Sequence, residues 1–350
     1  MDFIAPCHNS GMRVGIVGTG AISHKHAQAY RNIGYRTVAC AASSSARAKA
    51  FADQYGCEPL ERWQDVCVRS DIDFVDVCTF PDFRLEAVEL CAQLKKHVQV
   101  QKPIATKIPT AQRMVEIARH AGILLNVVSQ HRFDESAQFL KRAIGAGRLG
   151  RMLQADAYVK WYRPPSYYAR PVKGSWAIEG GGALINQAIH QVDLLLWLAG
   201  RIRRVTGEWQ LGAVHAIESE DVVSAVLRYE SGATGVIQAA TAFQPGYPER
   251  LEFHGARGTA IVSGDKLTTW DVEGDAGEPP PLTRSLASGA SDPMAISLAP
   301  FERQFLDFGD AIRTGRPPLV SGEEGYRALE VVTAIYDSCR SGNAVEIEKT

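Results

Sequence analysis

The chain lacks three features that would assign it to a special class of protein: a long apolar run, an excess of one charge, and a cysteine motif. No apolar segment reaches the roughly 20 residues that a membrane-spanning helix requires, and residues 1–6 lack the basic and apolar regions of a secretion signal. Lys and Arg number 38 against 39 Asp and Glu, so the net charge is -1, which argues against general nucleic-acid or membrane binding. We therefore expect a cytoplasmic protein without nucleic-acid or membrane partners.

The cysteines argue against a metal site and against a disulfide framework. There are 7, an odd number, and no two are spaced as Cys-x-x-Cys. Most lie in segments with strand or helix patterns, so we interpret them as reduced thiols in the core and expect no metal. The remaining composition, 45% hydrophobic and 22% charged, is typical of a globular protein, and 350 residues are enough for two domains.

A glycine-rich turn near the N-terminus predicts a dinucleotide-binding site. Residues 13–17 have the length and β-branched content of a buried parallel strand, and residues 21–30 have helical spacing. Between them, Gly18 and Gly20 allow a sharp turn and the close approach of a pyrophosphate, whose charge the first helical N–H groups stabilise. Ser23 stands where a third glycine is usual. We expect cofactor contacts at Gly18, Gly20, Ala21 and Ile22.

No Asp or Glu occurs between residues 3 and 52, and this absence bears on the choice of cofactor. A site for NAD usually has an acidic residue about 20 residues after the glycines, which accepts hydrogen bonds from the ribose 2′-hydroxyl. Here the expected strand is followed by Ser43 and Ser44, which can donate to a phosphate, and by Arg47, which can pair with it. We therefore favour NADP over NAD. The alternative is that the serines cap a helix and Arg47 is solvated.

Strands and helices alternate up to residue 128, which predicts a parallel sheet whose ligand lies beyond the carboxyl ends of the strands. Thr79 and Lys102 follow two such strands. After residue 128 strand patterns dominate, and residues 230–232 are typical of a hairpin turn. The expected fold class is α/β, with a Rossmann doubly wound parallel sheet over residues 1–128 and an α+β domain with a large, mostly antiparallel open sheet over residues 129–350.

The expected elements are read from apolar periodicity and turn residues. They are strands over residues 13–17, 36–42, 74–78, 97–100, 124–128, 152–162, 222–229, 233–240, 250–254 and 259–262; helices over residues 21–30, 85–94, 110–120, 135–144, 180–198, 301–313 and 325–340; and a surface loop over residues 274–293.

Two sets of residues could carry chemistry. On a helix after the glycine run 180–182, Asn186, His190 and Asp193 would share one face, and a histidine is suited to accept a proton near neutral pH. Lys102 precedes a proline at a strand end, from which it could reach a nicotinamide ribose and a substrate hydroxyl. The alternatives are a structural histidine beside a core helix and an ordinary surface lysine.

Three motifs occur in order along the chain: Gly-Ile-Val-Gly-Thr-Gly-Ala-Ile-Ser at residues 15–23, Gln-Lys-Pro-Ile-Ala at 101–105, and Gly-Gly-Gly-Ala-Leu-Ile-Asn-Gln-Ala-Ile-His-Gln-Val-Asp at 180–193. Residues 315–318 and 334–338 add support. Together these segments resemble the GFO/IDH/MocA superfamily of glucose-fructose oxidoreductases and inositol dehydrogenases. The resemblance implies an enzyme that transfers a hydride between a nicotinamide cofactor, NADP or NAD, and a secondary hydroxyl or ketone of a sugar or cyclitol ring.

The resemblance also implies roles for individual residues. Lys102 would position cofactor and substrate and stabilise a developing alkoxide, and His190 would act as acid or base. The chain departs from the family pattern at three places: Gln101 replaces the usual Glu, Asn186 replaces an Asp one helical turn before the histidine, and Arg84 stands where many members have a histidine. The first change removes a negative charge beside Lys102, and the second leaves His190 without a carboxylate one turn away.

Aromatic and polar residues predict the substrate contacts. Residues 160–168 mix aromatic faces with Lys and Arg, which suits a sugar ring carrying a carboxylate or phosphate. For each residue alone, packing of an aromatic cluster under a loop is the alternative. The catalytic candidates are Lys102, His190 and Asn186; the cofactor candidates beyond the glycine turn are Ser43, Ser44, Arg47, Thr79, Gln101 and Lys102; and the substrate candidates are Gln130, Arg132, Tyr162, Arg163, Trp176, Asn186 and His190.

Two other functions stay open at this point. One is an NAD-dependent dehydrogenase that oxidises C3 of a UDP-linked uronate. The other is a cofactor-sensing regulator, since some members of the superfamily have lost catalysis, although the presence of both Lys102 and His190 argues against it. The resemblance further implies a homodimer or homotetramer that pairs the open faces of the antiparallel sheets.

Overall fold

The structure is a computed structural model, and it describes residues 11–170, 172–275 and 297–348. By their contacts, the described residues fall into two compact units. The first comprises the residues up to Ile104 together with Pro109–Val128 and Leu298–Glu323, and the second comprises Ala105–Ile108, the residues from Ser129 to Ser297, and those from Glu324 onward. The sequence-contiguous division at residue 128 assigns the segment 298–323 to the second domain, whereas its contacts lie within the first unit.

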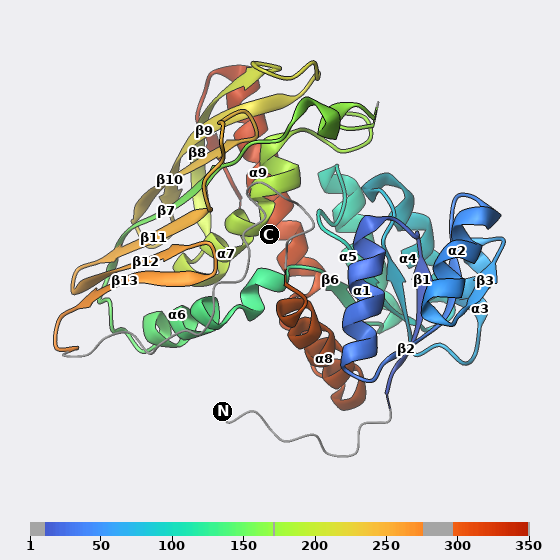
Figure 1. Cartoon of the computed structure of the whole chain (residues 1–350). Helices are drawn as coiled ribbons and strands as arrows, with labels where there is room; N and C mark the ends of the chain where they lie inside the picture. Colours follow the sequence, from blue (N-terminus) through green and yellow to red (C-terminus); the bar gives the residue numbers. More distant parts are fainter. Residues whose placement is uncertain (1–10, 171, 276–296, 349–350) are drawn as a thin grey trace. The chain divides into compact units, whose positions relative to one another are not determined.

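The first unit is built on a six-stranded parallel sheet with the strand order β3-β2-β1-β4-β5-β6 (Figure 1). Strands β1 and β4 are buried along almost their whole length, as expected for a parallel sheet covered on both faces. The strand order reverses between β1 and β4, and such sheets bind ligands beyond the carboxyl ends of the strands at this point. The strands are β1 (Arg13–Val17), β2 (Arg36–Ala41), β3 (Glu58–Leu60), β4 (Phe74–Val77), β5 (His97–Val100) and β6 (Leu125–Val127).

A helix from near the end of the chain completes the first unit. Helix α8 packs on α1, and Asn32 donates to Glu302 over 2.6 Å although 270 positions separate them. The rings of Phe305 and Tyr30 lie 4.4 Å apart between these helices, and Phe308 lies 5.0 Å from Phe74 of the sheet. The helices of this unit are α1 (Ala21–Asn32), α2 (Ser45–Tyr55), α3 (Trp63–Val68), α4 (Arg84–Gln93), α5 (Ile108–Ala121) and α8 (Ala299–Thr314).

The second unit contains an eight-stranded sheet with the order β13-β12-β11-β7-β10-β9-β8-β14 (Figure 1). All neighbouring strands are antiparallel except β7 and β10. The strands are β7 (Met152–Lys160), β8 (Ile202–Leu211), β9 (Glu220–Tyr229), β10 (Thr234–Ala240), β11 (Arg250–Gly255), β12 (Gly258–Ser263), β13 (Lys266–Val272) and β14 (Val345–Glu346).

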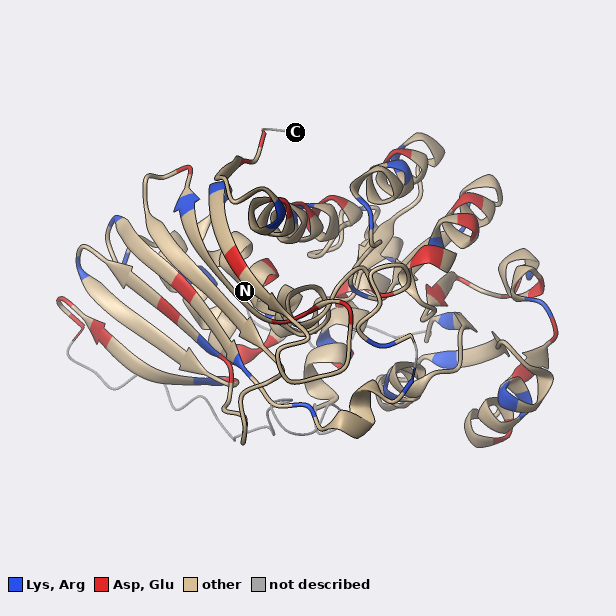
Figure 2. Ribbon diagram, turned by 90° about the horizontal axis from the view of Figure 1, so that it is seen from above, with Lys and Arg blue, Asp and Glu red and all other residues tan. Residues whose placement is uncertain are grey.

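Helices cover one face of this larger sheet. Along β9, buried and exposed residues alternate, so one face is packed and the other is open. Helix α7 packs on β7 and β11, and the N–H of Gly207 on β8 donates to Ser338 of α9 over 2.9 Å. Basic and acidic residues are interspersed along the strands and helices of both units (Figure 2). The helices are α6 (Glu135–Gly145), α7 (Ile189–Ala199) and α9 (Gly322–Ser341).

The fold class expected from the sequence is confirmed, and so are most of the elements. Five elements were not expected, namely β3, α3, β8, β13 and β14, because these segments are short or carry charged residues on an exposed edge. For α2, only a helix start near Arg47 was expected, without an end. The loop expected over 274–293 lies mostly outside the described residues. Within the described part of the chain, no helix combines the length and the apolar character needed to cross a membrane.

Candidate active site

The glycine turn in the first unit has the geometry of a nucleotide-binding turn. Gly18 has a φ of 95°, and a Cβ there would lie 3.0 Å from the carbonyl carbon of Cys78, so both conformation and space require glycine. Gly20 differs, because its φ of -81° suits any residue and a Cβ there would meet nothing within 4 Å. The protein itself therefore gives no reason for glycine at position 20, whereas a ligand approaching the backbone does.

The surroundings of this turn fit a polar ligand. Ser23 donates to the carbonyl of Gly20 over 2.6 Å and thereby closes the turn. Gly20 is the N-cap of α1 and supplies no side-chain cap, so the N–H groups of the first turn around Ala21 and Ile22 can bind an anion. The buried hydroxyls of Thr19 and Thr79 have no hydrogen-bond partner among the described residues, although such groups are nearly always paired. A dinucleotide phosphate or ribose supplies the acceptors and donors that these groups need.

The residues expected at the adenosine ribose lie together after β2. Ser44 caps α2 by accepting from the N–H of Arg47 over 3.4 Å, as the capping alternative predicts. Arg47 also donates to the hydroxyl of Ser43 over 3.4 Å, and all three residues are exposed. Ser44 can cap the helix and bind an anion at the same time, because its oxygen accepts from Arg47 while its hydroxyl proton stays available as a donor.

Lys102 follows β5 and is half-buried. The loop that carries Lys102 is held by Arg84, which is buried. Arg84 donates to the carbonyls of Gln101 and Pro103 in this loop and, over 2.6 Å, to the carbonyl of Thr79. Burial lowers the pKa of Arg84 to about 9, which still leaves the guanidinium charged at neutral pH. One buried cation thus joins the chain segments that follow β4 and β5.

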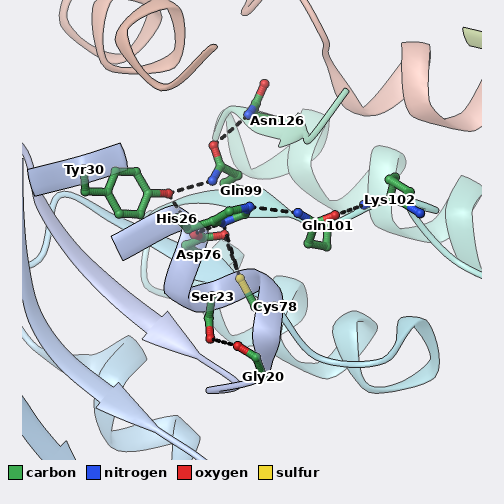
Figure 3. Close-up of polar contacts among 10 residues, drawn as sticks. All are labelled: Gly20, Ser23, His26, Tyr30, Asp76, Cys78, Gln99, Gln101, Lys102 and Asn126. Carbon is green, nitrogen blue, oxygen red and sulfur yellow. Dashed lines mark hydrogen bonds and ion pairs between the residues drawn. The ribbon is translucent and has the colours of Figure 1, made fainter. Parts of the chain in front are cut away.

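The side chain of Gln101 is directed toward His26 of α1 (Figure 3). Its Oε1 accepts from the N–H of Lys102 over 3.0 Å, and its Nε2 lies 2.8 Å from Nε2 of His26. Its carbonyl is already bonded to Arg84. We therefore leave Gln101 out of the proposed cofactor contacts, because the polar atoms described for it serve other residues.

In the second unit, the triple glycine passes close to β9 and α9. A Cβ on Gly182 would lie 1.9 Å from the carbonyl oxygen of Glu220, and one on Gly181 would lie 2.4 Å from the hydroxyl of Tyr336. The Glu220 carboxylate accepts from the N–H groups of Gly182 and Leu184, each over 2.8 Å, and from Tyr336 over 2.7 Å. Burial raises the pKa of Glu220 to about 7 despite these donors.

The helix expected after the glycines begins with a π-helical turn, η4 (Leu184–Ala188), before α7. A π turn has wider i to i+5 bonding and is frequent at functional sites. Asn186 lies within this turn and His190 in α7, so the backbone between them is not the regular α-helix that the sequence predicts. Asp193 does not extend their polar face, because its buried carboxylate bonds to Ser129 over 2.5 Å and to Arg132 over 2.6 Å.

Asn186 has a carboxylate nearby that is not evident from the sequence. Its Nδ2 donates to the carbonyl of Gly181 over 3.2 Å and lies 3.4 Å from Glu179. Glu179 is buried and also forms an ion pair with Lys173 over 2.5 Å. With the amide nitrogen used in this way, the carbonyl oxygen is the part of Asn186 suited to accept a hydrogen bond from a substrate hydroxyl.

His190 lies against a second histidine that sequence reasoning also missed. The rings of His190 and His131 meet edge to face, with centroids 5.1 Å apart and an angle of 80°. His131 is 2.7 Å from Asp134. Burial lowers the pKa of His131, but the carboxylate of Asp134 outweighs this effect, so its pKa is raised.

Two predicted substrate residues are engaged within the second unit. Arg132 is 1% exposed, forms ion pairs with Asp193 and Glu324 over 2.6 and 2.8 Å, and lies over the ring of Trp197. Trp176 donates its ring N–H to the carbonyl of Glu218 over 3.0 Å and packs against other aromatic rings. Because their polar groups already have partners, we leave both out of the proposed substrate site.

The remaining substrate candidates differ in exposure. Gln130 and Arg163 are buried, and the Arg163 guanidinium lies 4.8 Å over the ring of Trp161, as the packing alternative predicts. Tyr162 is partly exposed and pairs with Ala242 beside the sheet. Tyr162 is therefore the candidate of these three that is exposed enough to offer an aromatic face to a sugar ring.

Two groups of side chains in the described residues have the composition of metal ligands. Both have alternative partners, since Asp76 accepts from Tyr30 over 2.7 Å and Asp156 accepts from the N–H of Val236 over 2.8 Å. We assign a metal to neither. The groups are His26, Asp76 and Cys78 in the first unit and Asp156, Glu252 and His254 in the second.

The residues that sequence reasoning missed share one property. His26, His131 and Glu179 contact predicted site residues directly, whereas Asp76 and Glu220 contact the segments that hold them. These partners are far apart in the sequence, so local patterns do not indicate such contacts. Asp76 is the one with a local signal, because an Asp is rare in an apolar parallel strand.

Comparison with known proteins agrees with this geometry. Residues 12–129 match the oxidoreductase family with an NAD-binding Rossmann fold, and residues 137–261 match the GFO/IDH/MocA C-terminal domain. The chain is 30% identical to D-apiose dehydrogenase of Paraburkholderia graminis over 95% of its own length and 89% of the relative. It is 27% identical to myo-inositol 2-dehydrogenase of Thermotoga maritima over 97% of this chain and 99% of the relative.

A solved structure extends the likeness to three dimensions. The WlbA dehydrogenase of Bordetella pertussis, in complex with NADH and UDP-GlcNAcA, has a TM-score of 0.85 and 29% identity over 97% of this chain and 100% of that one. The matches cover both units in the order found here. The glycine turn, the Lys102 loop and the segment from the triple glycine to His190 all lie within the matched residues, and the chain belongs to the GFO/IDH/MocA family of NAD-binding oxidoreductases.

Proposed function

We propose that the chain is an NAD(P)-dependent oxidoreductase that transfers a hydride between nicotinamide and a secondary hydroxyl or ketone of a sugar or cyclitol ring. The proposal is carried by an observation in each unit. In the first, Lys102 lies on a loop that Gln101 and Arg84 hold, and in the second, Asn186 lies within a π-helical turn that His190 follows. Relatives named as dehydrogenases of apiose and myo-inositol support this substrate class.

The residues divide the chemistry between them. The nicotinamide ring, when bound, accepts or gives the hydride. His190 takes the proton of the substrate hydroxyl during oxidation and returns it during reduction. Lys102 donates to the same oxygen and stabilises the negative charge that develops there. Asn186 accepts from a neighbouring hydroxyl and thereby orients the ring.

Turnover assays test this assignment directly. The purified chain is mixed with NADP or NAD and a panel of free pyranosides, cyclitols, anhydro-sugars and UDP-sugars while the absorbance of reduced nicotinamide is followed. We expect turnover of one class, and a fall of kcat by roughly 100-fold or more in Lys102→Ala and in His190→Ala. Wild-type turnover in both variants would show that the catalytic residues are wrongly assigned.

For the cofactor, we propose a preference for NADP. Ser43 and Ser44 offer hydroxyl donors and Arg47 a guanidinium at the end of β2, and no acidic residue occurs between residues 3 and 52. Ser43→Asp introduces a carboxylate that accepts from a ribose 2′-hydroxyl and repels a 2′-phosphate. We expect it to shift the ratio of kcat/KM from NADP toward NAD by roughly tenfold or more. An unchanged ratio would favour an NAD-dependent enzyme.

One observation favours a second candidate within the same class. A 29% identical structure is that of a dehydrogenase in complex with NADH and UDP-GlcNAcA. An NAD-dependent dehydrogenase of a UDP-linked uronate is therefore the alternative to a free-sugar enzyme. Turnover of UDP-sugars alone in the panel, with NAD preferred, would select it. Cofactor binding without turnover of any substrate would instead support a cofactor-sensing regulator.

We also propose that the chain forms a homodimer or homotetramer through the open face of the eight-stranded sheet. This face carries the outward side chains of β9, among them Val226, which is apolar and 58% exposed. Light scattering at micromolar concentration is expected to give two or four chain masses. Val226→Lys places a charge on each paired face, so it is expected to dissociate the assembly, and a wild-type monomer would contradict the proposal.

A further inference from the structure

A buried hydrogen-bond network lies within the first unit beneath the Lys102 loop (Figure 3). Its side chains come from α1, β4, β5 and β6, and none has a role in the reaction proposed above. They are almost completely shielded from solvent. The members are Gln101, His26, Asp76, Tyr30, Gln99 and Asn126.

The hydrogen bonds from Lys102 inward have only one possible direction. A backbone N–H only donates, so the Gln101 oxygen, 3.0 Å from the N–H of Lys102, is the acceptor. The Gln101 amide nitrogen therefore faces His26 and donates to its Nε2 over 2.8 Å. Nε2 must then lack a proton, so His26 carries its proton on Nδ1 and donates to Asp76 over 2.7 Å.

A second chain of donors ends on the same carboxylate. Asn126 donates to the oxygen of Gln99 over 2.9 Å, and the amide nitrogen of Gln99 donates to the hydroxyl of Tyr30 over 2.7 Å. Tyr30 in turn donates to Asp76 over 2.7 Å. Asp76 is therefore the charged end of both chains, and only the first chain reaches Lys102.

Apolar rings isolate the network from water. Phe305 of α8 lies 4.9 Å and Phe301 5.5 Å from the His26 ring. Burial alone would raise the pKa of Asp76, but the donors from His26 and Tyr30 outweigh it and keep the pKa low. The other titratable groups beside His26 are Tyr30 on its own helix and Cys78 after β4, and the nearby cation is Arg84.

We propose that Gln101, His26 and Asp76 are positioning residues for Lys102: they fix the backbone at Lys102 through a chain of three hydrogen bonds anchored on a buried carboxylate. The role of Lys102 in catalysis rests on the proposed function, whereas the chain of bonds does not. The chain works with neutral His26 because Gln101 supplies the proton between them.

A glutamate at position 101, which the family usually has, would change this arrangement. A carboxylate accepts from the Lys102 N–H but has no proton for His26. The bonds at Nε2 and to Asp76 would then both form only if His26 carried protons on both nitrogens. With the natural Gln101, all three bonds form with a neutral His26.

The first test reads the network without substrate or cofactor. Nitrogen NMR of the His26 ring at neutral pH is expected to show protonated Nδ1 and unprotonated Nε2. In Gln101→Glu, Nε2 is expected to carry a proton, because the carboxylate can only accept. A wild-type His26 with its proton on Nε2 would refute the assigned direction.

The second test asks whether the chain positions Lys102. Gln101→Met keeps the size of the side chain and removes both bonds, whereas Tyr30→Phe removes a buried bond from the other chain and serves as the matched control. Amide hydrogen exchange at Lys102 is expected to accelerate at least roughly tenfold in Gln101→Met and to stay near wild type in Tyr30→Phe. Equal exchange at Lys102 in both variants would overturn the positioning role.

Kinetics connect this role to the reaction. In Gln101→Met we expect kcat to fall roughly 10- to 100-fold with KM for the cofactor little changed, while Tyr30→Phe stays within about twofold. If the Lys102 amide exchanged slowly but the enzyme turned over no substrate, the hydrogen-bond chain would stand. Only the proposed function would be refuted.

Discussion

At the scale of single residues, Gly20 separates what the fold needs from what a ligand needs. Its φ of -81° suits alanine, and a Cβ would meet nothing within 4 Å. We expect Gly20→Ala to leave the unfolding free energy within about 1 kcal/mol of wild type. The added methyl lies where a pyrophosphate would approach, so dinucleotide affinity is expected to fall roughly tenfold or more.

Fluorescence titration with reduced nicotinamide cofactor and thermal melting measure the two effects. Gly18→Ala is the contrasting variant, because Gly18 has a φ of 95° and a Cβ there would be 3.0 Å from Cys78. It is expected to lose stability as well as affinity. Unchanged cofactor affinity in Gly20→Ala would contradict the placement of the phosphates.

The residues visible from sequence were those with a local signature. Gly18, Gly20 and Lys102 stand at strand ends beside glycine or proline, and this local context is enough to indicate a site. The partners that hold them could not be found in this way. Gln101 meets His26 across 75 positions, so only the strand order brings them together.

The same limit explains why two residues predicted at the substrate site do not belong to the proposed one. Arg132 and Trp176 have the chemistry of sugar ligands, and the sequence contains no sign that Asp193 and Glu218 already engage them. Which partner a long side chain selects depends on tertiary packing, which composition and periodicity do not determine.

At the scale of elements, Glu220 of β9, which bonds to the N–H groups of Gly182 and Leu184, makes the stability of the folded protein depend on pH. Its folded-state pKa of about 7 lies above the ordinary value of 4.5, so the folded protein binds a proton more tightly than the unfolded chain. The stability from this group is complete below about pH 4.5 and is lost as pH rises toward about 7. At about 1.4 kcal/mol per pKa unit, the loss is about 3 kcal/mol.

Urea unfolding from about pH 4 to 8 measures this effect in wild type and in Glu220→Gln, whose side chain does not titrate. We expect the stability of wild type relative to Glu220→Gln to decrease over this range. Glu208→Gln, at an exposed position of β8, is the control. The difference in unfolding free energy between wild type and this variant is expected to stay constant with pH. A flat difference for Glu220→Gln as well would show that this carboxyl does not titrate near neutral pH.

The helix after the triple glycine was predicted from the sequence, but its π-helical first turn was not. Apolar spacing predicted a helix after the triple glycine, and a helix is there. The widened first turn depends on Glu220 and Tyr336, which bond to Gly182, Leu184 and Ile185 from β9 and α9. Such a local departure from the α-helix is set by distant acceptors and donors, so periodicity alone does not reveal it.

At the scale of the whole molecule, the segment 298–323 belongs by its contacts to the first unit although it follows the second in sequence. The rings of Phe301, Phe305 and Phe308 on α8 are almost fully buried, against His26, Tyr30 and Phe74 among others. A fragment ending at residue 128 would expose this apolar face and open the Asp76 network to water. At about 2 kcal/mol for each buried ring, the lost packing approaches the total stability of a small domain.

We therefore expect a fragment of residues 1–128 to be unfolded or aggregated, and the same fragment joined by a flexible linker to residues 298–323 to fold and bind the dinucleotide. Circular dichroism melting and cofactor fluorescence distinguish the two. In the linked fragment, Phe305→Ser removes a central ring, so this variant is expected to be unfolded or aggregated like residues 1–128 alone. If residues 1–128 alone melted cooperatively and bound cofactor, α8 would be dispensable, and the nucleotide-binding unit would end where the sequence-based division places it.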